Sequence, residues 1–204
     1  EDGTIQDKSN RIATSADSSE DNYTYYTPQN DIQTFFPEVL GTGADVFLKA
    51  EGFQLSFSPV SQGAFAGTLT TTKGFDSIQY RDVFGKETVL KYTPLFSGLK
   101  EEIILQRPAE NKIQFLLKTY EMEAVLTDNV ISLFSDGTRC VGEISKITIY
   151  DSSAIPKVST DSTVTLTATD KKGEYLYTIS LDQNFLLRED IEYPVYVDPT
   201  VTIS

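Results

Sequence analysis

The stretch TVTLTATDKKGEYLYTI, residues 163–179, contains two strand patterns joined by a turn. In its first half Val164, Leu166 and Ala168 alternate with threonines, which places the apolar side chains on one face of an extended strand. The polar residues 170–173 then supply a turn, and residues 175–179 are again aromatic and β-branched. This stretch therefore predicts an antiparallel β-hairpin.

The same pattern recurs on both sides of this hairpin. Phe53, Leu55 and Phe57 share a face, and residues 123–134 form a second hairpin pattern before the turn signal Asp136-Gly137. Such runs follow one another with turn signals every 8–12 residues or so, the spacing of a sandwich or barrel. Helical periodicity is limited to one short turn within residues 182–190. We therefore predict an all-β fold, a mostly antiparallel β-sandwich of about a dozen strands.

The chain divides into a polar start and a strand-rich remainder. Residues 1–30 are rich in Ser, Asp, Asn and Thr, and this composition predicts a flexible linker or tail. Its exception is the cluster Tyr23, Tyr25 and Tyr26, which forms either a first edge strand or a segment docked on the domain. Residues 31–204 are predicted to form the sandwich module, in which residues 31–74 either form a separate sub-unit or share one core with the rest.

Composition excludes several function classes. The 204 residues carry 17 basic and 30 acidic side chains, a net charge of −13, so we expect no nucleic-acid partner. No apolar run reaches the roughly 18 residues of a membrane helix, so no membrane insertion is expected. The absence of His rules out Ser-His-Asp and Cys-His catalysis and His-ligated zinc within this chain. The single Cys140 cannot form an intrachain disulfide, and its neighbours predict a strand with a buried thiol.

Carboxylates alone could still hydrolyse glycosides, so a glycoside hydrolase or lyase stays as one alternative. The candidate acids are Asp82, Glu101, Glu102, Asp151 and Asp198. The adjacent Glu101 and Glu102 would point to opposite faces of a strand, which argues against a shared site. No EF-hand loop is present, and no metal ligands can be assigned. We expect no cofactor, although a loose calcium site remains open.

Carbohydrate binding is the second alternative, because β-sandwich modules can stack sugars on exposed aromatic rings. The chain has no Trp but 11 Tyr. The candidate ligand-binding residues are Tyr23, Tyr25, Tyr26, Tyr80 and Tyr92, each of which could equally be a rim or core residue.

Several short motifs occur together in the C-terminal two thirds. They are YRDVF at 80–84, LKY at 90–92, GLKEEIIL at 98–105, IYD at 149–151 and YPVYVDPT at 193–200. Their order resembles the β-rich region that precedes DNRLRE domains and RHS (YD) repeats in large wall-associated bacterial surface proteins. The resemblance covers about residues 75–204. It implies an extracellular, cell-wall-associated protein with neighbouring β modules as partners, and it supplies no catalytic residues. A cell-surface glycan or protein is a further candidate partner.

The last motif also has a physical interpretation as a structural signature, formed by Tyr193, Pro194, Asp198 and Pro199. Each proline fixes its own φ and biases the preceding residue towards an extended conformation. Residues 195 and 197 then point to one face and residue 196 to the other. We therefore expect a stiff last strand that docks on the domain.

The leading hypothesis is a non-catalytic structural or interaction module of a larger secreted or wall-associated bacterial protein. Three arrangements distinguish it from its alternatives. An enzyme predicts a cleft that holds two carboxylates. A binding module predicts a shallow groove or an exposed aromatic platform, whereas a simple spacer predicts neither and has its termini at opposite ends.

Overall fold

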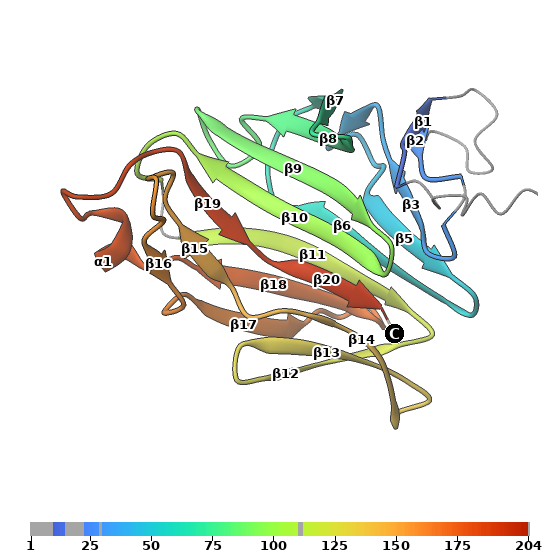
Figure 1. Cartoon of the computed structure of the whole chain (residues 1–204). Coiled ribbons are helices and arrows are strands. Elements are labelled where there is room, and N and C mark those ends of the chain that lie inside the picture. The colour runs from blue at the N-terminus through green and yellow to red at the C-terminus, as the bar shows by residue number, and fades with distance from the viewer. Residues whose placement is uncertain (1–9, 15–22, 29, 110–111, 204) are drawn as a thin grey trace, which may run out of the picture.

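The computed structural model describes residues 10–14, 23–28, 30–109 and 112–203. In this part of the chain, twenty strands and one short helix, α1 (Gln183–Leu186), form the regular structure. The strands make two antiparallel sheets that lie face to face (Figure 1). The predicted all-β sandwich is confirmed. There are more strands than predicted because several are two-residue segments too short to show periodicity.

The first sheet has eight strands in the order β1-β2-β3-β5-β6-β11-β18-β17. Their bounds are β1 (Ala13–Thr14), β2 (Tyr25–Tyr26), β3 (Gln33–Phe36), β5 (Val46–Ala50), β6 (Phe53–Pro59), β11 (Lys112–Tyr120), β17 (Thr163–Ala168) and β18 (Glu174–Ser180). The hairpin predicted from residues 163–179 is the pair β17–β18 at one edge, in which Val164 lies opposite Ile179.

The second sheet has twelve strands, nine of them in the order β12-β13-β14-β20-β10-β9-β8-β7-β4. Their bounds are β4 (Val39–Leu40), β7 (Phe65–Thr72), β8 (Phe75–Arg81), β9 (Thr88–Leu95), β10 (Gly98–Leu105), β12 (Glu123–Thr127), β13 (Val130–Ser135), β14 (Arg139–Ile144) and β20 (Thr200–Ile203). The remaining three are β15 (Thr148–Tyr150), β16 (Val158–Ser159) and β19 (Val195–Asp198); β19 pairs with β10 and with β15.

One apolar core lies between the two sheets. Alternation places Phe115 and Leu117 of β11 on the inner face of the first sheet, and Leu99 and Ile103 of β10 on the inner face of the second. The residue range 31–74 belongs to this same core, because its strands join both sheets and side chains such as Phe57 pack in the common cluster. It is not a separate sub-unit.

The described residues of the predicted N-terminal linker also belong to the sandwich. Residues 13–14 and 25–26 form the edge strands β1 and β2, and Tyr23 packs edge-on against Phe47, with ring centroids 4.8 Å apart. Packing of the aromatic rings therefore holds this segment on the sandwich, although its polar composition predicted a flexible linker. The other residues of the segment 1–30 lie outside the described part of the chain.

Cys140 lies in a strand as expected, but its predicted burial is wrong, since the residue is exposed. A β-bulge explains the difference. Phe134 pairs with Cys140 while Leu133 pairs with Gly142, so Val141 is the extra residue. The bulge breaks the strand's alternation and leaves Val141 buried and Cys140 in solvent.

Both ends of the described chain lie at the same end of the sandwich. The amide of Ile12 donates to the Asp76 carboxylate (3.0 Å), beside the β7–β8 turn. The amide of Ile203 donates to the carbonyl of Ser97 (2.7 Å), in the β9–β10 turn. Because β8 and β9 are antiparallel, these two turns are neighbours. No helix in the described ranges is long and apolar enough to span a membrane.

Candidate functional site

Four turns lie at the end of the sandwich that holds Ile12 and Ile203, on the side where β20 ends (Figure 1). They surround two adjoining hollows. They are the β5–β6, β11–β12, β13–β14 and β17–β18 turns. The hollows have volumes of about 550 and 440 Å³ and share Glu121 and Asp136. Both volumes are within the range of small-ligand sites. We call the two hollows together the turn groove; its lining residues are Glu51, Gly52, Phe53, Thr119, Tyr120, Glu121, Met122, Glu123, Phe134, Ser135, Asp136, Gly137, Arg139, Val141, Lys172, Gly173 and Tyr175.

Thr119 holds two of these turns together. Its amide donates to the carbonyl of Gly173 (2.7 Å), and its hydroxyl donates to the carbonyl of Met122 (2.8 Å). Gly173 has a φ of +73°, and a Cβ there would lie 2.5 Å from the carbonyl oxygen of Thr119. Only glycine permits both this backbone conformation and this close approach. The wall between the β11–β12 and β17–β18 turns is therefore fixed by backbone contacts.

Aromatic side chains supply the apolar surface of the turn groove. Tyr120 is 65 % exposed at the end of β11. Phe134 and Tyr175 are half-buried, and the hydroxyl of Tyr175 accepts a long hydrogen bond from the amide of Ala124 (3.4 Å). An exposed Tyr ring beside fixed aromatic neighbours offers a face on which a flat, partly apolar ligand can stack.

Charged side chains around these rings supply polar contacts. The acids are Glu51, Glu121, Glu123 and Asp136, and the bases are Arg139 and Lys172. All six are exposed, and within the described ranges none of the six takes part in an ion pair. Their carboxylates accept and their cations donate hydrogen bonds, so this arrangement can bind a polyhydroxylated ligand without covalent chemistry.

The tyrosines selected from the sequence do not line the turn groove. Tyr80 and Tyr92 are fully buried in the core, where the Tyr80 hydroxyl donates to the carbonyl of Pro37 (2.7 Å). The prediction that they could present a sugar-binding surface is therefore wrong. Tyr23, Tyr25 and Tyr26 are half-buried on the N-terminal strands, and Tyr25 packs against the core. The residue that sequence reasoning missed is Tyr120, whose position next to a turn was its only signal.

The candidate catalytic acids lie outside the turn groove, and two of them, Glu102 and Asp198, share Lys100 as an ion-pair partner. Glu101 and Glu102 point to opposite faces of β10, as predicted; Glu101 points inward, and Glu102 pairs outside with Lys91 and Lys100 (both 3.0 Å). Asp82 accepts the amide of Glu87 (2.7 Å) in the β8–β9 turn, and Asp198 pairs with Lys100 (3.3 Å). None of the five candidates lines the turn groove.

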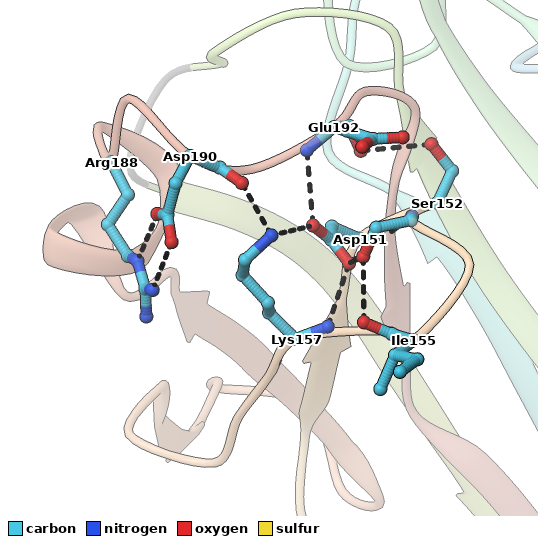
Figure 2. Close-up of polar contacts among 8 residues, drawn as sticks. Asp151, Ser152, Ile155, Lys157, Arg188, Asp190 and Glu192 are labelled. Atoms are coloured by element: carbon cyan, nitrogen blue, oxygen red, sulfur yellow. Dashed lines mark hydrogen bonds and ion pairs between the residues drawn. The ribbon is translucent and has the colours of Figure 1, made fainter.

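Asp151, the fifth candidate, connects two loops at the other end of the sandwich (Figure 2). Its buried carboxylate accepts hydrogen bonds from the Ser153 hydroxyl (2.6 Å) and from the amides of Lys157 (2.8 Å) and Glu192 (3.1 Å). Although desolvation opposes ionisation, these donors and the Lys157 ammonium hold the pKa of Asp151 well below its usual value. With every oxygen engaged, Asp151 has a structural role.

Within the C-terminal signature, the strand β19 alternates as its sequence predicted. Val195 and Val197 are fully buried, while Tyr196 faces outward and stacks on Tyr150, with centroids 5.0 Å apart. The Tyr193–Pro194 bond is cis, and the Tyr193 hydroxyl donates to the carbonyl of Leu186 (2.9 Å).

Pro199 separates two segments that pair with different parts of β10. β19 pairs with residues 103–105, and β20 with residues 98–100. Asp198, just before Pro199, accepts the hydroxyl of Thr200 (2.8 Å).

In the described part of the chain, no group of three or more His, Cys, Asp or Glu side chains is placed to share a metal ion. Comparison of the chain with protein-family models, curated protein sequences and solved structures found no match. The function proposed below therefore rests on the residues of this chain.

Proposed function

We propose that this chain is a non-catalytic binding module of a larger exported bacterial protein and that it binds carbohydrate in the turn groove. The observation that carries the proposal is Tyr120, an exposed ring beside carboxylates and cations that have no ion-pair partner in the described chain. A sugar ring placed on Tyr120 would bury its apolar face, and its hydroxyls would meet Glu121, Glu123 and Lys172.

The exported, wall-associated setting is supported by the resemblance of residues 75–204 to β-rich regions of bacterial surface proteins. The binding role is favoured over the two alternatives by placement. None of the candidate catalytic acids lines the turn groove, and Glu101 and Glu102 face opposite sides of their strand. A simple spacer would need no such groove, and the meeting of four turns around it favours the binding role.

A glycan-array screen of the purified chain tests the proposal, with one arm in calcium and one in chelator. We expect saturable binding to one glycan class. Loss of binding in chelator would add a calcium site to the groove. A blank array at high protein concentration, or release of shorter glycans on incubation, would contradict carbohydrate binding or the non-catalytic assignment respectively.

Two matched variants locate the site. Tyr120→Ala removes the exposed ring in the groove, and we expect it to weaken binding by about tenfold, equivalent to roughly 1.4 kcal/mol. Leu187→Ala removes an equally exposed apolar side chain, 68 % exposed, beside α1 at the other end of the sandwich. Equal affinity of the Tyr120→Ala variant and the wild type would place the ligand elsewhere.

A further inference from the structure

Three polar side chains lie inside the core, between the two sheets. Tyr92 and Glu101 face each other across the β9–β10 ladder of the second sheet, and Tyr177 belongs to β18 of the first sheet. Their exposed fractions are 0, 2 and 1 %. Tyr177 is enclosed by aromatic packing, stacked on Phe115 with centroids 6.0 Å apart. This is a polar cluster in surroundings that are otherwise apolar.

One oxygen on each of these side chains has no hydrogen-bond partner within the protein: the hydroxyls of Tyr92 and Tyr177 and Oε2 of Glu101. Buried polar atoms without a partner are rare, because each forfeits its hydrogen bonds to water at a cost of about 1–3 kcal/mol. Tyr80, also fully buried nearby, shows the usual arrangement, since its hydroxyl donates to the carbonyl of Pro37.

The Glu101 carboxyl is an electrostatic neighbour of both tyrosine hydroxyls. Desolvation, with the Glu101 carboxyl beside them, raises the pKa of both Tyr92 and Tyr177. Burial raises the pKa of Glu101 to about 8; the neighbouring Tyr92 hydroxyl lowers it, and the charge on Asp198 raises it. Tyr92 therefore lies close to Glu101, yet neither its hydroxyl nor Oε2 forms a well-directed hydrogen bond.

We propose that Tyr92, Glu101 and Tyr177 bind a water molecule between the two sheets. Buried waters typically make about three hydrogen bonds to polar groups that would otherwise be unpaired, which is the number of unpaired oxygens here. A single carboxyl group and two neutral hydroxyls are a poor ligand set for a cation, which favours water as the occupant. The site joins strands of both sheets through hydrogen bonds, in addition to their apolar contact.

Tyr→Phe substitutions test the proposal by the sign of their effect. A hydroxyl bonded to a bound water stabilises the fold, so we expect Tyr92→Phe and Tyr177→Phe each to raise the unfolding equilibrium constant by about fivefold. In the double variant, the increase in the unfolding equilibrium constant should be about threefold smaller than the product of the two single increases, because both hydroxyls act through one water. If the hydroxyls had no partner, their removal would leave the stability unchanged or raise it. Phe variants as stable as the wild type, or more stable, would therefore overturn the proposal.

Tyr80→Phe is the matched control, because its hydroxyl already has a protein partner. Tyr80→Phe should destabilise the fold. In a double variant with Tyr177→Phe, the two increases in the unfolding equilibrium constant should simply multiply, because the two hydroxyls share no partner. A high-resolution crystal structure of the whole chain supplies the second measurement. Density for an ordered water within hydrogen-bond distance of all three oxygens supports the site, whereas direct Tyr–Glu hydrogen bonds with no density between them overturn it.

Discussion

The docking of the last strand depends on Gly98 of β10. Residue 98 lies opposite Thr202 of β20, and a Cβ at Gly98 would stand 2.0 Å from the carbonyl oxygen of Val201. That oxygen belongs to the backbone and cannot move aside without shifting β20. On the other side of β20, a Cβ at Gly142 would lie 2.5 Å from the carbonyl oxygen of Thr202. β20 thus lies between two glycines that permit its close approach.

We expect Gly98→Ala to displace β20 from the sheet. The strand buries Val201 and Ile203, which are 1 and 7 % exposed. At roughly 1.5–3 kcal/mol for each buried aliphatic side chain, releasing both lowers the free energy of unfolding by about 3–6 kcal/mol. This is a large fraction of the stability of a typical domain, so the variant should be strongly destabilised.

Urea unfolding followed by circular dichroism measures the loss, and hydrogen exchange of residues 200–203 locates it. Gly137→Ala is the control. Gly137 has a φ of +69° and nothing within 4 Å of its Cβ position, so its substitution should cost only backbone strain, about 1 kcal/mol. If Gly98→Ala lost no more stability than Gly137→Ala, with β20 still protected from exchange, the steric argument would be refuted.

Three further predictions follow from single side chains. Burial raises the folded-state pKa of Glu101 to about 8, whereas the unfolded chain ionises near 4.5, so stability should fall as pH rises between these values and then level off. Glu101→Gln should abolish this fall, which amounts to at most about 5 kcal/mol, in pH titrations of urea unfolding. Asp151→Asn should lower the melting temperature and speed hydrogen exchange in residues 152–157 and 189–192, whereas Asp190→Asn, at an exposed ion pair with Arg188, should change neither appreciably. Exposed Cys140 should react with a thiol reagent in the native state as fast as in urea, and slow native labelling would contradict its position beside the bulge.

Much of the fold could be predicted because period-two alternation is a local signal. It identified β17 and β18 and the inward and outward sides of β10 and β19. The same signal could have shown that Tyr80 and Tyr92 are buried, since each lies two residues from a core aliphatic, Ile78 and Leu90. They were selected as ligand-binding candidates because they are tyrosines, without regard to the strand face on which the alternation places them.

The turn groove could not be predicted in the same way. Asp136-Gly137 and residues 170–173 predict turns, but their meeting depends on the order of strands within each sheet and on how the sheets pack. The edge strand offered as one option for Tyr23, Tyr25 and Tyr26 corresponds to β2, but β1 was missed, because it is two residues long and is held only by pairing with a neighbour. Such non-local contacts produce no periodic hydrophobic pattern in the sequence.

The shared end of the two described chain termini has a mechanical consequence. Tension applied between Ile12 and Ile203 would act across the strands at one end of the sandwich. The short strand β1, held by two residue pairs with β2, would separate first. β20 would follow, opening from β10 and β14 one hydrogen bond at a time from Ile203. Under load the domain should therefore yield in two steps, and the second step, peeling of the last strand, would begin beside Val141 in the wall of the turn groove.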